Sequence, residues 1–98
     1  MLSTCFEQLR SGTSRYVIWF SAAWCGPCQR MDREALIAAA ADAGLPMYYA
    51  DYAENEVFAT TCDVKQFPTF VLYQGSIVIS SRASADTTKV CQWLKKMA

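Results

Sequence analysis

Histidine is absent from this chain of 98 residues, and its absence removes several classes of chemistry. Catalytic pairs of cysteine and histidine, serine triads that need histidine, and metal sites with histidine ligands are all excluded. A net charge is lacking as well, because nine lysine and arginine residues are matched by nine aspartate and glutamate residues. Nucleic acids and anionic membranes attract a basic excess, so we expect neither as a partner.

Long hydrophobic runs are also missing. The longest apolar stretch covers residues 16–25, is interrupted by Ser21, and has about half the length of a membrane span. No charged segment followed by an apolar core begins the chain, so we expect no secretory signal. Without such a signal, an odd total of five cysteines argues against a framework of structural disulfides. The expected location is therefore a reducing compartment, the cytoplasm.

The length predicts one domain over residues 1–98. Apolar residues make up 53% of the chain, which is enough for a core without a structural metal. The apolar patterns predict helices at 3–10, 28–41, 54–62 and 86–97, and strands at 16–20, 46–51, 69–73 and 77–80. Strands that alternate with helices, followed by a hairpin across Gly75, predict an α/β fold with a mixed sheet and helices on both faces.

The most informative stretch is Trp24-Cys25-Gly26-Pro27-Cys28, between a strand-like run and a helix-like segment. Residues three apart at a helix start lie about 5–6 Å from each other, within reach of a disulfide. The helix N-terminus presents unpaired N–H groups and the positive end of the dipole, and both favour a thiolate. By position, Cys25 is the predicted nucleophile, nearer solvent, and Cys28, one turn further in, is the predicted resolving cysteine.

Less specific interpretations of the two cysteines compete with this one. A single C-x-x-C is often half of a zinc or iron–sulfur site, but the other three cysteines stand alone in the sequence, and the ligand count argues against a metal. A permanent structural disulfide would close a loop too short to constrain the unfolded chain much. We therefore predict no metal site and a dithiol that opens and closes reversibly.

These five residues match the active-site motif of the thioredoxin family, and nearly the whole chain resembles that family. A second match is Phe67-Pro68-Thr69 before a predicted strand, where thioredoxins have a cis proline that faces the cysteines. The resemblance implies a thioredoxin fold with a central mixed sheet of four to five strands. The first edge strand is expected to be short or missing, because only residues 1–3 could form it.

The implied activity is reduction of protein disulfides through a dithiol–disulfide cycle of Cys25 and Cys28, with no bound cofactor. The implied partners are thioredoxin reductase as reductant and substrates such as peroxiredoxin and ribonucleotide reductase, with the protein acting as a monomer. The resemblance also implies a docking surface for substrates, with pairing of a substrate backbone at Phe67. Its residues are Trp24, Gly26, Pro27, Phe67, Pro68 and Ala85. The competing function is that of an adaptor with the same fold that binds partners with little turnover.

The sequence departs from the family pattern at several positions. Trp19 stands where thioredoxins usually carry a buried aspartate that helps move the proton of the resolving cysteine, so it is either a core residue or a modulator of the site. Arg33 replaces the proline that kinks the following helix, and Ser84 replaces a glycine near the last helix. With an aromatic residue at position 19, the chain resembles tryparedoxins and the thioredoxins of trypanosomatids. This resemblance implies that a small dithiol such as trypanothione could serve as the reductant.

The three remaining cysteines are expected to be free thiols. Cys62 lies on the apolar side of the predicted short helix at 54–62, and it is either a buried free cysteine or a regulatory or dimer-forming thiol. Cys5 and Cys91 lie among helical residues, and we interpret both as structural.

Overall fold

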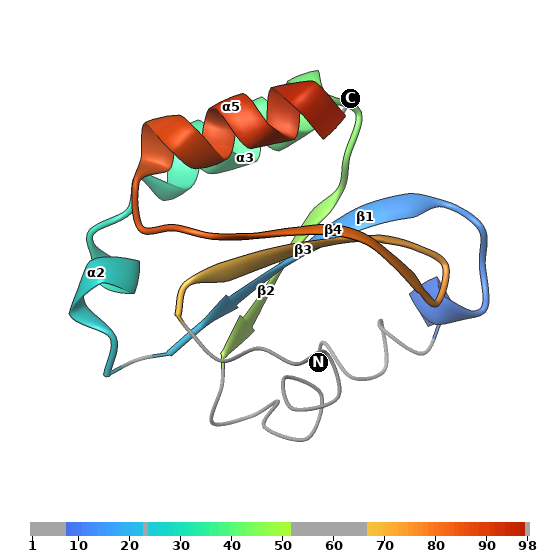
Figure 1. Ribbon diagram of the computed structural model, residues 1–98, viewed down its shortest axis with the longest axis horizontal. Coiled ribbons are helices and arrows are strands. Elements are labelled where there is room, and N and C mark those ends of the chain that lie inside the picture. The colour runs from blue at the N-terminus through green and yellow to red at the C-terminus, as the bar shows by residue number, and fades with distance from the viewer. Residues whose placement is uncertain (1–7, 23, 52–66, 98) are drawn as a thin grey trace.

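The computed structural model describes residues 8–22, 24–51 and 67–97 (Figure 1). In these ranges four strands form one sheet in the order β2-β1-β3-β4, with bounds β1 (Arg15–Ser21), β2 (Met47–Asp51), β3 (Thr69–Gln74) and β4 (Ile77–Ala83). β1 is parallel to β2 and antiparallel to β3, which is in turn antiparallel to β4. The sheet is mixed, as the sequence predicts.

Three helices are described: α2 (Gly26–Gln29), α3 (Arg33–Asp42) and α5 (Thr87–Met97). α3 and α5 lie side by side over one face of the sheet (Figure 1). On the other face Leu9, from a helical turn at residues 8–10, packs against the sheet. The predicted helix at 54–62, most of the one at 3–10 and residues 1–3, which alone could form a first edge strand, lie outside the described residues.

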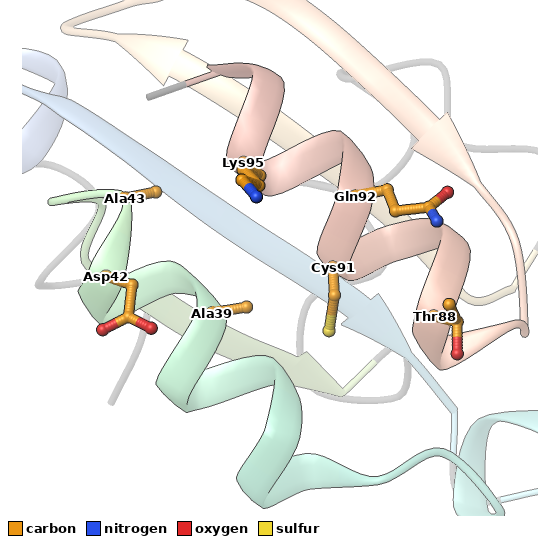
Figure 2. Close-up of a pocket in the computed structure, with 7 residues that line it drawn as sticks. All are labelled: Ala39, Asp42, Ala43, Thr88, Cys91, Gln92 and Lys95. Atoms are coloured by element: carbon orange, nitrogen blue, oxygen red, sulfur yellow. The ribbon is translucent and has the colours of Figure 1, made fainter.

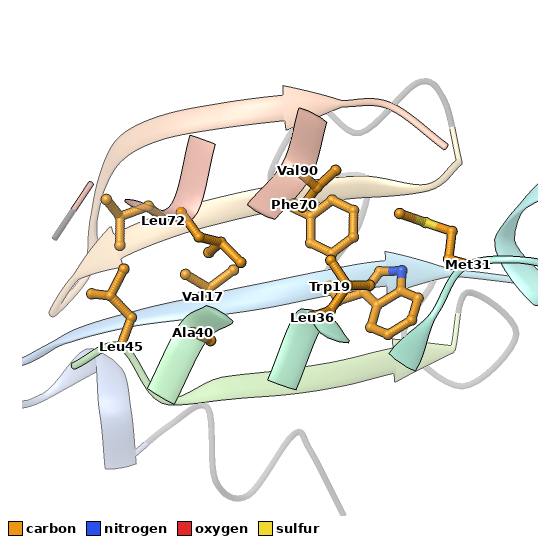
Figure 3. Close-up of a cluster of buried hydrophobic side chains, with 10 residues drawn as sticks. Val17, Trp19, Met31, Leu36, Ala40, Leu45, Phe70, Leu72 and Val90 are labelled. Carbon is orange, nitrogen blue, oxygen red and sulfur yellow. The ribbon is translucent and has the colours of Figure 1, made fainter. Parts of the chain in front are cut away.

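The two central strands explain how the core divides. β1 and β3 are buried along almost their whole length, which fits their continuous apolar sequences. Alternate residues of β1 point to opposite faces, so Val17 and Trp19 join α3 and α5, whereas Ile18 and Phe20 face the other side. Figure 3 shows Trp19 between the sheet and the helices, beside Phe70 and Met31.

The prediction of one continuous helix over residues 28–41 is wrong. The chain leaves helical geometry after Gln29 and starts again at Arg33, although Arg33 occupies the position of the family's kink-forming proline. Asp32 causes this break because it is the N-cap of α3. Its backbone is extended, and its carboxylate accepts the N–H of Ala35 at 3.0 Å. A capping aspartate therefore separates the two helices without a proline.

This break also changes which residues of α3 face the core. Helical spacing from the second cysteine predicts an inner side of Met31, Ala35 and Ala38 or Ala39. Met31 is buried and Ala39 packs against the core, but the fully buried residues of α3 are Leu36 and Ala40, and Ala38 is exposed. Since α3 begins at Arg33, a helical period counted from the second cysteine is out of phase with the real helix.

The predicted ends of the sheet and the last helix need only small corrections. β4 continues to Ala83, three residues beyond its predicted end, because it pairs with β3 as far as Thr69. In α5, Val90 and Leu94 are buried as expected, and the half-buried Trp93 packs against the same core. No helix in the described ranges is both long enough and apolar enough to cross a lipid bilayer.

Candidate active site

Cys25 and Cys28 form a disulfide at the start of α2, with their Cα atoms 5.3 Å apart. Cys25 is the N-cap of this helix, with extended backbone angles, and its Sγ accepts the backbone N–H of Cys28 at 3.3 Å. Pro27 falls in the first turn, where a missing N–H leaves no hydrogen bond unmade. The donor that points at Cys25 Sγ would stabilise a thiolate there once the disulfide opens.

The end of β1 positions this helix through its backbone. The carbonyl oxygen of Ala22 accepts the backbone N–H of Cys25 at 3.0 Å and the side-chain amide of Gln29 at 3.1 Å. Both bonds hold α2 against Ala22, the residue that directly follows β1, so the central strand of the sheet positions the cysteines.

The second sequence match lies against the first in space. The Phe67–Pro68 peptide bond is cis, and the carbonyl oxygen of Phe67 is 3.6 Å from Cys25 Sγ. Phe67 also packs against the small cluster of Ala22 and both cysteines. Pro68 is buried and leads into β3. Two motifs 42 residues apart in sequence thus form one site.

The surface around the disulfide is partly apolar and open. Cys25 and Cys28 are 6% and 3% exposed, so the second cysteine is the more enclosed, as expected. Trp24 is 69% exposed and meets the ring of Phe67 edge-on, with centroids 5.6 Å apart. Gly26 and Pro27 are exposed beside it.

Ala85 belongs to the turn that precedes α5 and is exposed. A hydrogen bond from the backbone N–H of Asp32 to Thr87 Oγ1, at 3.1 Å, ties the start of α5 to the segment after α2. Figure 1 shows this turn and α2 at the same end of the molecule. The structure therefore places all six predicted docking residues at one end of the sheet.

Trp19 is buried, with 3% of its surface exposed. Its ring stacks on Phe70 and meets Tyr49 edge-on, each at a centroid distance of 5.3 Å. The guanidinium group of Arg33 covers both aromatic rings of positions 19 and 49. The position that usually holds a carboxylate in this family thus holds a packed aromatic ring beside a cation.

Of the other cysteines, the structure describes only Cys91, because Cys5 and Cys62 lie outside the described ranges. Its Sγ points from α5 toward α3 (Figure 2). The thiol contacts the carbonyl oxygen of Ala35 at 3.8 Å. Burial, and to a smaller extent the negative charge of Asp32, raises the pKa of this thiol. Cys91 lines a pocket of about 430 Å³ between the two helices, and its thiol is less ionised than an ordinary one.

Sequence reasoning missed several residues that shape this site. Asp32 caps α3, Arg33 covers Trp19, and Ser21 is fully buried with an unpartnered hydroxyl among the described residues. Ser21 offered a signal, since it is the one polar residue inside a long apolar run. The sequence marks Arg33 only as the replacement of the family's proline, which does not predict its contact with Trp19, and Asp32 gives no signal, because a charged residue in a helical segment is ordinarily solvated.

The fold and the cysteine pair together define a class of protein. A disulfide at a helix N-terminus, next to a cis proline and beside an exposed tryptophan, is typical of the thiol–disulfide oxidoreductases. In the described part of the chain, no group of three or more acidic, cysteine or histidine side chains could hold a metal ion.

Comparison with known proteins gives the family. The thioredoxin family model matches residues 3–96, so the chain belongs to the thioredoxin family. It is 30% identical over 87 residues to the thioredoxin of Malassezia sympodialis, covering 87% of this chain and 83% of that protein. It is also 30% identical to mitochondrial thioredoxin-3 of Saccharomyces cerevisiae, covering 94% of this chain and 72% of the yeast protein.

Solved structures agree with this assignment. The oxidised yeast thioredoxin-3 superimposes with a TM-score of 0.78 at 32% identity, covering 96% of this chain and 89% of that one. The thioredoxin of Trypanosoma brucei brucei gives a TM-score of 0.80 at 24% identity, covering 96% of this chain and 83% of that one, and shows the shared fold. The protein is a thiol–disulfide oxidoreductase with a redox-active Cys25–Cys28 pair.

Proposed function

We propose that Cys25 attacks a disulfide in a protein substrate and that Cys28 resolves the mixed disulfide. The observation that carries this assignment is the N-cap position of Cys25, whose sulfur accepts the N–H of Cys28 at 3.3 Å. In the first step the Cys25 thiolate bonds to one substrate sulfur and the other leaves as a thiolate. Cys28 then bonds to Cys25, and the remaining substrate sulfur is released reduced.

The proposed docking surface consists of Trp24, Gly26, Pro27, Phe67, Pro68 and Ala85. Trp24, Gly26 and Pro27 are exposed next to the disulfide, and the edge-on contact with Phe67 holds the Trp24 ring beside Cys25. An exposed aromatic ring beside an apolar loop suits binding of an extended peptide segment around a disulfide. Pro68 lies beneath this surface and supports it through β3.

Turnover of a protein disulfide tests both cysteine roles. We expect the protein to reduce insulin with dithiothreitol as electron source, and Cys25→Ser to abolish that activity. Cys28→Ser, reduced beforehand and freed of dithiothreitol, should instead accumulate a mixed disulfide between Cys25 and an insulin chain, visible by mass spectrometry. Cys91→Ser is the matched control and should retain full turnover, because its thiol lies between α3 and α5.

Two results would contradict the proposal. A mixed disulfide through Cys28 in the Cys25→Ser variant, together with none through Cys25 in the Cys28→Ser variant, would reverse the roles. Binding of substrate without turnover by the parent protein would favour the adaptor function instead.

We propose that the reduced protein passes electrons to peroxiredoxins and ribonucleotide reductase in the cytoplasm, and that a thioredoxin reductase restores the dithiol. Support for a peroxiredoxin comes from a solved relative, 31% identical, whose structure concerns thiol resolution in a yeast mitochondrial 1-Cys peroxiredoxin through glutathione and thioredoxin systems. Incubating the oxidised protein with a thioredoxin reductase and NADPH, or with reduced trypanothione, and then measuring by alkylation and mass spectrometry how much of the Cys25–Cys28 pair is reduced decides between the two reductants.

A further inference from the structure

Two polar side-chain atoms are buried with no hydrogen-bond partner among the described residues, namely Trp19 Nε1 and Ser21 Oγ. Their residues are 3% and 0% exposed. They stand two positions apart on β1, so both side chains point to the same face of the sheet. Buried polar groups in folded proteins almost always have a partner, so a pair without one on the same face indicates a specific role.

Both atoms lie at the end of β1 that leads to the disulfide. Figure 3 shows the indole nitrogen of Trp19 on the edge of the ring that faces Met31. The N–H of Met31 donates to the carbonyl oxygen of Cys28 at 3.4 Å. Ser21 directly precedes Ala22, which packs against Cys28. The residues next to these two atoms, Met31 and Ala22, thus both contact the segment that carries the inner cysteine.

We propose that Trp19 Nε1 and Ser21 Oγ hold a buried water molecule that donates a hydrogen bond to the sulfur of Cys28 when the disulfide is open. The inference rests on the role of Cys28 proposed above. An indole N–H only donates, and a serine hydroxyl donates or accepts, so the water oxygen can accept from Trp19 while its own hydrogens reach Ser21 and Cys28. Buried waters typically make about three such bonds.

The water acts on the step in which Cys28 closes the cycle. The Cys28 thiol first loses its proton to solvent, and the water stabilises the resulting thiolate by donation. The thiolate then bonds to Cys25 Sγ, and the bond between Cys25 and the substrate sulfur breaks. The substrate sulfur leaves as a thiolate and takes a proton from solvent. A donor to the thiolate thus takes the place of a base that accepts the proton.

Among the described residues, the charged and titratable groups around this site come from three elements and one turn. Arg33 is the first residue of α3 and Asp32 is the N-cap of that helix. Tyr49 belongs to β2, Cys91 belongs to α5, and Arg30 follows α2. Replacing Trp19 by phenylalanine or Ser21 by alanine changes none of their charges. A change in the titration of Cys28 in either variant therefore reports the lost hydrogen bond.

The first test measures the pKa of Cys28 in a Cys25→Ser background, from the pH dependence of alkylation at the Cys28 peptide. We expect Ser21→Ala and Trp19→Phe each to raise this pKa by about one unit, so that roughly tenfold less thiolate is present at neutral pH. Ser80→Ala and Trp93→Phe are matched controls, because Trp93 Nε1 already donates to Ser80 Oγ at 3.3 Å. Both controls should leave the pKa unchanged.

An unchanged pKa in Ser21→Ala would overturn the proposal, even if Trp19→Phe failed to fold. A second measurement follows the indole ¹⁵N–¹H resonances of the reduced Cys25→Ser protein across pH. The Trp19 resonance should shift with the titration of Cys28, whereas that of Trp93 should not, and a pH-independent Trp19 resonance would also overturn the proposal. Neither measurement needs turnover, so a failure of the proposed cysteine roles would appear separately in the insulin assay.

Discussion

The Arg33 guanidinium lies over the indole ring of Trp19, 5.7 Å from the ring centre. Both residues differ from the family pattern, because Arg33 replaces a proline and Trp19 replaces an aspartate. The structure shows that these two substituted side chains contact each other. A cation over an aromatic face is attracted by the ring's negative quadrupole, by about 0.5–1 kcal/mol at an exposed site. The first turn of α3 is thereby attached to the central strand β1.

Restoring the family's carboxylate with Trp19→Asp should strongly destabilise this protein. The change removes a large buried ring that stacks on Phe70 and buries a charge in its place. The expected loss in unfolding free energy is at least about 3 kcal/mol, measured by urea denaturation. Trp19→Phe serves as the milder comparison and should lose less. An unchanged midpoint in Trp19→Asp would contradict the packing described for this residue.

Removing the cap of α3 should weaken the fold by a smaller amount. Asp32→Ala deletes the carboxylate that accepts the N–H of Ala35, at a cost of about 1 kcal/mol in urea denaturation. Asp32→Asn keeps an oxygen acceptor at the same place and should remain within a few tenths of a kcal/mol of the parent. Equal losses in the two variants would mean that the charge, rather than the cap, stabilises the helix.

Cys91 should react slowly with alkylating agents until the pH is high. Its pKa lies above the ordinary value of 9.0, because burial disfavours the thiolate and Asp32 adds a negative charge nearby. Because the pKa of Cys91 is higher in the folded than in the unfolded protein, the neutral thiol stabilises the fold fully at pH values below the unfolded pKa. This stabilisation is lost as the pH rises through the folded pKa.

The variant Asp32→Asn removes that charge and should speed alkylation of the Cys91 peptide at pH 8, as measured by mass spectrometry. Asp42→Asn is a matched control, because Asp42 lines the same pocket but is not a cause of the shift. An alkylation rate that rises equally in both variants would refute the specific effect of Asp32.

Trp24→Ala should lower the rate with a protein substrate while leaving the fold intact. Its ring is 69% exposed, so little buried packing is lost. We expect kcat/KM for insulin to fall several-fold, about 1 kcal/mol of transition-state binding, with little change for a small aromatic disulfide. Ile77→Ala removes an equally exposed apolar side chain from β4 and should change neither rate. A parallel loss with both substrates would indicate damage to Cys25 rather than to docking.

The sequence predicts most of the fold, because the apolar pattern of each segment and the order of strands and helices along the chain indicate the same mixed sheet. The apolar run of β1 and the hairpin across Gly75 are strong signals, and both elements form where expected. The break between α2 and α3 escaped prediction, since Asp32 resembles any exposed acidic residue until its carboxylate is seen to cap Ala35. The cysteine pair was predictable from spacing alone.

The surroundings of that pair were less predictable. The unpartnered state of Ser21 and Trp19 depends on which face of β1 the helices cover, and a single sequence does not fix that packing. The contact of Arg33 with Trp19 likewise joins residues whose spacing in sequence predicts no pairing.

The hydrogen bond from Asp32 to Thr87 has a mechanical consequence for the redox cycle. Hydrogen bonds hold the segment from Cys25 to Asp32 at both of its ends. Ala22 binds Cys25 and Gln29, and Thr87 at the start of α5 binds Asp32. When the sulfur–sulfur bond opens, these two attachments still hold α2, so any rearrangement is confined to a single helical turn. A partner protein would therefore distinguish the two redox states by the chemistry of two sulfur atoms and not by a change in the shape of the scaffold.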